Sequence, residues 1–127
     1  MDRNHAIKFF FVFVATLVIG ACAGMATPAK VADGVLTDPA GMTLYTFDRD
    51  TQGSGKSACN GPCIQLWPAF TAASDAKPSG DWTVVTRDDG GKQWAFKGKP
   101  LYTYAKDTKA GEKTGDGFNK VWHTATP

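Results

Sequence analysis

An eight-residue segment that occurs twice constrains the fold of this chain more than any other feature. Residues 44–51 read LYTFDRDT and residues 101–108 read LYTYAKDT, so five of the eight positions are identical. In each copy of this octad, aromatic side chains alternate with smaller ones, which is the period-two pattern of a half-buried strand. The repeat therefore indicates two homologous units that pack against each other.

The segments around both octads predict short strands. The chain contains 14 glycines, many threonines and a single glutamate, Glu112, a composition that favours turns and strands over helix. A hairpin is expected before each octad, with turns at residues 38–41 and 88–91. After each octad a polar loop leads to an apolar segment that contains a tryptophan, Trp67 or Trp122.

We therefore expect an all-β fold: a small sandwich or partly closed barrel built from two pseudo-symmetric repeats, with little helix. The domain is expected to span residues 35–127, with repeats at about residues 35–70 and 82–124. Each repeat contributes one tryptophan to a shared core. Strand order does not follow from these patterns.

The N-terminus has the pattern of an export signal. Arg3 and Lys8 precede the apolar run at residues 9–21, which is shorter than the ~20 residues of a membrane span. We expect residues 1–21 to be a signal peptide, with an uncleaved anchor as the alternative. Residues 22–34 are small, polar and unpatterned, and are expected to form a tether.

Residues 19–22, Ile-Gly-Ala-Cys, resemble a bacterial lipobox. The resemblance implies that Cys22 becomes the lipidated first residue and that the membrane is a partner through this anchor. Ordinary cleavage at a nearby small-x-small site is the alternative, and it would discard Cys22. The expected location is the periplasm or outer membrane as a lipoprotein, or otherwise outside the cell as a secreted protein.

Only Cys59 and Cys63 remain after either kind of cleavage. Two cysteines four positions apart in an exported chain most simply form a structural disulfide. The alternative is a soft-metal site for copper, or a thiol-redox module, that uses both cysteines and His123. The C-x3-C spacing resembles that of copper-delivery proteins of the Sco type, although nothing else in the sequence does. We expect no cofactor.

Each octad contributes two aromatic residues and one aspartate. Tyr45 and Phe47 share one face of the expected strand, as do Tyr102 and Tyr104, and that face is expected to be buried. Asp50 and Asp107 follow directly, where a carboxylate accepts backbone N–H groups and fixes a turn. The alternative interpretation makes the tyrosines and aspartates ligand groups in a symmetric cleft.

Three motifs together carry a family resemblance. They are the Tyr-x-aromatic-x-x-Asp pattern in both octads, the segment CNGPC before Trp67, and the segment GDGFNKVWH at residues 115–123. They resemble the bacterial "secreted repeat of unknown function" family, whose members are predicted lipoproteins. The resemblance implies a small exported envelope protein, often lipid-anchored. The family has no established activity, so it implies no catalytic residue.

The sequence excludes several classes of function. A formal net charge of +2 provides no strong basic field for nucleic acid. No phosphate-binding loop, dinucleotide fingerprint, zinc spacing or serine elbow is present. We expect a non-enzymatic, lipid-anchored protein of the cell envelope with an unidentified protein or small-molecule partner. The copper or thiol-redox module is the first alternative, and a hydrolase is the least favoured.

Overall fold

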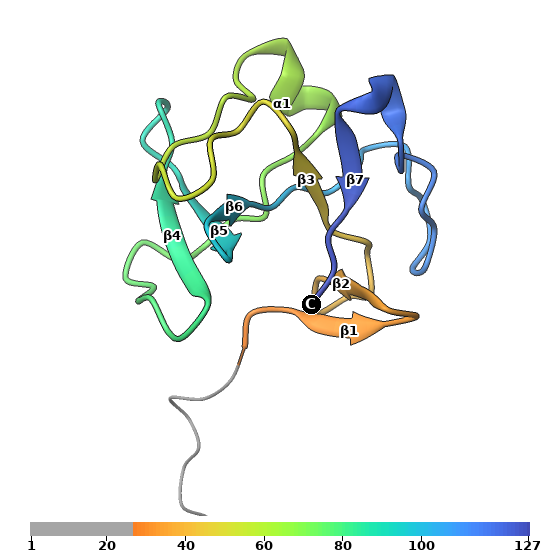
Figure 1. The fold of residues 1–127 in the computed structure, drawn as a ribbon, viewed down its shortest axis with the longest axis horizontal. Coiled ribbons are helices and arrows are strands. Elements are labelled where there is room, and N and C mark those ends of the chain that lie inside the picture. The colour runs from red at the N-terminus through yellow and green to blue at the C-terminus, as the bar shows by residue number, and fades with distance from the viewer. Residues whose placement is uncertain (1–26) are drawn as a thin grey trace, which may run out of the picture.

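The computed structural model describes residues 27–127, so the expected signal peptide and Cys22 lie outside the described residues. Its elements are listed here in chain order: β1 (Lys30–Ala32), β2 (Val35–Thr37), β3 (Tyr45–Phe47), α1 (Pro62–Leu66), β4 (Trp82–Thr86), β5 (Lys92–Phe96), β6 (Lys99–Pro100), the short 3-10 helix η2 (Phe118–Lys120) and β7 (Trp122–Thr124) (Figure 1). None of the helices in this part of the chain is long and apolar enough to cross a membrane.

The strands form three small antiparallel sheets, β1-β2, β3-β7 and β4-β5-β6. This arrangement confirms the expected all-β fold with two repeats, and the described strands do not close into a barrel. β3 of the first repeat pairs with β7 at the end of the second, with Thr46 opposite His123. The repeats are thus joined through strand pairing as well as side-chain packing.

The two octads meet at the centre of the molecule. The backbone N–H of Tyr45 donates to the carbonyl of Tyr102 at 2.7 Å, and the N–H of Tyr102 donates to the carbonyl of Tyr45 at 3.0 Å. This reciprocal pair relates equivalent positions of the two repeats and forms an isolated β-bridge. The first octad also forms β3, whereas the second forms no regular strand, because Tyr102 makes only single bridges to Tyr45 and Ala69.

The ordered structure starts before residue 35. β1 lies within residues 22–34, which were expected to form a tether, and pairs with β2 at Val31 and Leu36. All three β1 residues are exposed, and Val31 is 59% exposed. β1 is an edge strand without an inward-facing apolar side, so the alternating pattern that reveals a half-buried strand is missing.

The described residues contain one α-helix, α1, which begins directly after Gly61 in the cysteine loop. Pro62 at its first turn has no N–H to satisfy and a backbone φ suited to helix. The expected tight reversal between the two cysteines is therefore the start of a short helix. It carries the chain to Trp67.

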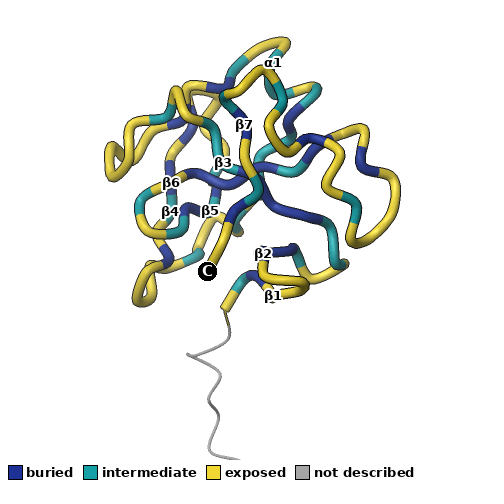
Figure 2. The backbone as a smooth tube through the Cα atoms, turned by 45° about the vertical axis from the view of Figure 1, so that its right-hand side comes forward, coloured by how far each residue is buried: buried dark blue, intermediate teal, exposed yellow. Residues whose placement is uncertain are grey.

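The core consists of two clusters on opposite sides of the octads. The aliphatic-rich cluster contains Ala29, Leu36, Leu44, Trp82, Leu101 and Ala125. The aromatic cluster contains Tyr45, Cys59, Trp67, Tyr102, Tyr104 and Trp122. Because neighbouring residues of an extended segment face opposite sides, Leu44 and Tyr45 enter different clusters. Figure 2 shows the buried segments running through the middle of the molecule and the exposed loops around them.

Candidate functional site

Four aromatic rings form a continuous stack at the centre of the aromatic cluster. In order they are Phe47, Trp122, Trp67 and Tyr104, with centroid separations of 4.2, 3.9 and 4.2 Å. The two tryptophans are nearly parallel at 3° and come from different repeats. The stack therefore provides the shared tryptophan core that the sequence predicts, with one outer ring from each octad.

Each octad tyrosine is bonded to the aspartate of the other octad. The Tyr45 hydroxyl donates to Asp107 Oδ2 at 2.5 Å, and the Tyr102 hydroxyl donates to Asp50 Oδ2 at 2.7 Å. Each tyrosine also lies edge-on to a tryptophan of the stack. The four residues thus form two separate crossed pairs, and both tyrosines are fully buried.

The carboxylates also brace the loops that follow them. Asp50 Oδ1 accepts the backbone N–H of Ala58 at 2.6 Å, and Asp107 Oδ1 accepts that of Thr114 at 3.0 Å. The loop contact matches the turn-fixing role expected from the sequence. The hydrogen bond to a tyrosine does not follow from the local sequence, because the partners are 52 and 62 residues apart.

Burial shifts the pKa values of Tyr45, Tyr102 and Asp50. It raises the pKa of Tyr45 and of Tyr102 well above the ordinary tyrosine value, and the adjacent carboxylates raise both pKa values further. Burial also raises the pKa of Asp50, against the opposing effects of the Ala58 N–H, the Tyr102 hydroxyl and the Arg87 charge. Both tyrosines are therefore neutral hydrogen-bond donors near pH 7, so neither provides a phenolate for chemistry.

A buried arginine extends the Tyr102 pair into a network that sequence reasoning missed. Ser57 Oγ lies 2.5 Å from the Tyr102 hydroxyl and accepts a bond from Arg87 Nη1 at 2.8 Å. Since Tyr102 gives its only hydroxyl proton to Asp50, Ser57 must donate to Tyr102. Arg87 also donates to Gln93, Asn60 and the Cys59 carbonyl, so this guanidinium organises the cysteine loop.

The expected disulfide is confirmed. Cys59 and Cys63 are bonded with an S–S distance of 2.02 Å, and Cys59 is fully buried in the aromatic cluster. His123 is paired with Asp48 instead, with Nε2 2.8 Å from Oδ2. Among residues 27–127, no group of three or more His, Cys, Asp or Glu side chains is placed to hold a metal ion. The structure therefore does not assemble Cys59, Cys63 and His123 into one site.

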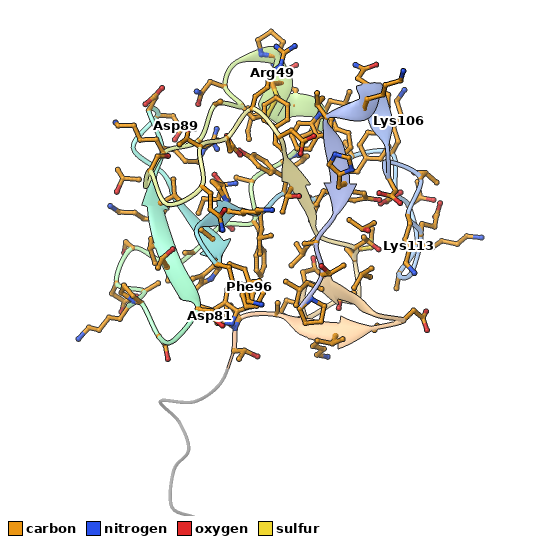
Figure 3. All side chains as sticks on the ribbon, in the orientation of Figure 1. Arg49, Asp81, Asp89, Phe96, Lys106 and Lys113 are labelled. Atoms are coloured by element: carbon orange, nitrogen blue, oxygen red, sulfur yellow. A yellow bond between two sulfur atoms is a disulfide. The ribbon has the colours of Figure 1, made fainter. Side chains whose placement is uncertain are left out.

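The His123–Asp48 pair lies in the wall of a cavity of about 310 Å³. Thr46, Asp48 and His123 line this cavity, and because side chains alternate along a strand, they lie on the opposite face of the β3–β7 pair from Tyr45, Phe47 and Trp122. Phe96 and Lys97, from the end of β5 and the following turn, form the other wall. Phe96 is labelled in Figure 3.

Contacts between the repeats hold the β5–β6 turn in place beside this cavity. Gln52 Nε2 donates to the Lys97 carbonyl at 2.7 Å, and the Gly53 N–H donates to the Gly98 carbonyl at 2.8 Å. A Cβ atom at Gly98 would lie 2.8 Å from the Gly53 nitrogen, and the φ of Gly98 is +80°. Glycine is therefore required where the two loops touch, and the cavity wall is fixed by tertiary contacts.

These contacts decide what the candidate groups can do. Each tyrosine is hydrogen-bonded to one aspartate and the two cysteines form a disulfide, so all six groups are engaged in contacts inside the protein. Ser57 is buried and bonded to Arg87 and Tyr102, with no histidine among its hydrogen-bond partners. The His123–Asp48 pair is half-exposed and faces a cavity, so it is the candidate group best placed to meet a ligand.

Comparison with known proteins identifies the repeat. A family described as a secreted repeat of unknown function matches the chain twice, at residues 27–71 and 83–126. The two matches cover more than half of the chain, and each contains one octad. No curated protein and no solved structure matches it. The resemblance inferred from the octads is confirmed: this chain belongs to the family of secreted repeats of unknown function.

Proposed function

We propose that this protein is a non-enzymatic, lipid-anchored binding domain of the bacterial cell envelope. Membership of a secreted family supports export, and the lipobox-like residues before Cys22 support the anchor. The observation that carries the non-enzymatic part is the crossed pairing of Tyr45 with Asp107 and of Tyr102 with Asp50. It engages the most distinctive polar groups of the family motif in hydrogen bonds inside the protein.

Mass analysis of the mature N-terminus tests the anchor. We expect a chain that begins at Cys22 and carries diacylglycerol, found in the membrane fraction. Cys22→Ser is the matched variant, because it removes the acceptor thiol and changes nothing in the described domain. It is expected to leave the protein unprocessed or to release it into the soluble fraction. An unmodified mature terminus beyond residue 22 in the native protein would rule out lipidation.

The structural-disulfide proposal and the soft-metal alternative make different predictions about the two cysteines. Thiol labelling of the native exported protein should find neither Cys59 nor Cys63 free, because they are bonded to each other. Anaerobic Cu(I) titration of the reduced protein provides the opposing test. Stoichiometric binding that is lost in both Cys59→Ser/Cys63→Ser and His123→Asn would support a copper site and contradict the proposal of a purely structural disulfide.

A panel of ester, peptide and glycoside substrates tests the absence of catalysis. We expect no turnover above that of a heat-unfolded sample. Turnover that is lost on Ser57→Ala or Asp50→Asn would contradict the proposal, provided that the variant still shows native near-ultraviolet circular dichroism from the tryptophan stack.

A further inference from the structure

We propose that the cavity beside His123 binds a small organic anion, with a carboxylate or phosphate group on a short carbon skeleton. The inference rests on the proposed binding role and assigns it a location and a ligand class. The cavity volume of about 310 Å³ lies at the lower end of the range for small-molecule sites. The space therefore suits a metabolite-sized molecule.

The two lysines in the cavity lining favour an anion. Lys97 and Lys99 line the cavity, and neither forms a salt bridge with any residue from 27 to 127. The Lys97 ammonium lies 5.2 Å from the centroid of the Phe96 ring, which also lines the cavity. The lining residues that carry a carboxylate are Asp48, which already pairs with His123, and Pro127 at the end of the chain. Two lysines that form no salt bridge with the described residues thus line the same space.

The remaining lining suits the rest of such a molecule. Phe96 is only partly buried and provides apolar surface for a carbon skeleton, whereas Leu101 and Ala125 line the cavity but are almost fully buried. Thr46, Thr124, Thr126 and Gln52 provide hydroxyl and amide groups that can bond to ligand oxygens. A few polar groups placed around an apolar surface are typical of small-molecule sites. A neutral sugar would leave the ammonium groups unused, and a cation would be repelled by them.

Two pairs of probes, each with a charged and a neutral member, test the ligand class. They are glycerol 3-phosphate with glycerol, and succinate with succinamide, titrated into the isotope-labelled full chain and followed by NMR. We expect the charged member of at least one pair to shift the amide signals of Thr46, Lys97 and His123. The neutral members should shift none of them. The pair that responds distinguishes a phosphate from a carboxylate ligand.

A double variant tests the two lysines. Lys97→Asn/Lys99→Gln removes both charges, and asparagine tolerates the positive φ of +50° at position 97. We expect anion affinity to fall at least about tenfold, the loss that follows from removing charge-assisted hydrogen bonds. Lys106→Gln/Lys113→Gln is the matched control, because both lysines are exposed and outside the cavity (Figure 3). It should change the affinity less than about twofold.

Each other outcome overturns the assignment. Equal losses in the two double variants would show non-specific attraction, and equal binding of neutral probes would show that the site does not select anions. Shifts confined to another surface would retain a binding role but place it elsewhere. An absence of binding by every probe would remove the anion site alone, because lipidation and the lack of turnover are measured independently.

Discussion

The two tyrosine–aspartate pairs of this protein start from the same octad but are completed in different ways. Tyr45 donates to Asp107, and its oxygen receives the backbone N–H of Gly115 at 3.3 Å. Tyr102 donates to Asp50, and its oxygen is contacted by the side chain of Ser57. One pair ends on the backbone, whereas the other continues through Ser57 to the buried guanidinium of Arg87.

The loops after the octads explain the difference. Ser57 and Thr114 follow their aspartates by the same seven residues, yet Ser57 faces Tyr102 whereas the Thr114 hydroxyl bonds to Asp107. The next residues are Ala58 and Gly115. Gly115 is buried against the Trp67 ring, whereas Ala58 is exposed. Both repeats thus contain the tyrosine–aspartate bond, whereas the contacts around it differ.

Removing the arginine should produce the largest change and affect only the Tyr102 side. Arg87→Met leaves Gln93, Ser57, Asn60 and the Cys59 carbonyl without their donor in a buried region, so we expect a loss of about 4 kcal/mol in the free energy of unfolding. Urea denaturation measures it. The control Lys92→Met alters an exposed hydrogen bond at the same end of the β4–β5 hairpin and should change stability by less than about 0.5 kcal/mol. Similar values for the two variants would contradict a structural role for Arg87.

Removing one hydroxyl from each pair compares them directly. Tyr102→Phe breaks bonds to both Asp50 and Ser57 and should destabilise the fold by about 3 kcal/mol. Tyr45→Phe breaks the bond to Asp107 and the longer, weaker bond from the Gly115 N–H, so its expected loss is smaller, about 2 kcal/mol. The rings remain in both variants, which keeps the aromatic packing constant. Thermal and urea unfolding give both values, and a reversed order would show that the Arg87 network adds nothing to the Tyr102 pair.

Substitution at the equivalent positions 115 and 58 should affect the two loops differently. In Gly115→Ala the new Cβ would lie 2.5 Å from Trp67 Cη2 and 2.9 Å from Tyr104 Cδ2, so we expect a loss of about 2 kcal/mol from overpacking. Ala58→Gly, the opposite change at the equivalent position, should cost about 0.5–1 kcal/mol through backbone entropy alone. The melting temperature and the near-ultraviolet circular dichroism of the tryptophans report both. An unchanged Gly115→Ala protein would contradict the close contact with the stack.

High pH should weaken the fold gradually through both pairs. The folded protein holds the Tyr45 and Tyr102 protons to a higher pH than the unfolded chain, whose tyrosines titrate near pH 10. Above about pH 10 the unfolded state therefore binds fewer protons, and stability falls by about 1.4 kcal/mol per pH unit for each tyrosine. Urea unfolding between pH 9 and 11 measures this slope. Tyr45→Phe and Tyr102→Phe should each reduce the slope by the contribution of one tyrosine. Unchanged slopes would show that the fold does not raise the pKa of these hydroxyls.

Local sequence patterns were sufficient for much of the architecture. The octads, the turn residues and the tryptophan positions predicted two β-rich repeats around a shared aromatic core. The spacing of Cys59 and Cys63 in an exported chain predicted their disulfide. These predictions succeeded because each depends on residues close together in the chain. β1 was not predicted because its three residues are all exposed and show no apolar alternation.

The candidate site could be predicted only in part, because its contacts cross the repeats. The sequence places Asp50 and Asp107 in bracing turns but does not indicate which tyrosine each would accept from. Arg87 carries no local sign of burial, since it precedes an Asp-Asp-Gly-Gly turn that is typical of an exposed hairpin end. The sequence groups His123 with the cysteines as a candidate metal site, yet strand alternation directs it to the opposite face of β7 from the aromatic cluster.

The sequence by itself determined that two similar strand-rich units occur in one chain, which residues of each octad share a face, and which cysteines pair. Packing of the units decided that each tyrosine bonds to the other repeat's aspartate, that Arg87 becomes buried, and that His123 and Asp48 open onto a cavity. The physical reason is the separation along the chain over which each interaction acts. Backbone preference and side-chain alternation act over a few residues, whereas these hydrogen bonds form only after segments more than 50 residues apart have been brought together.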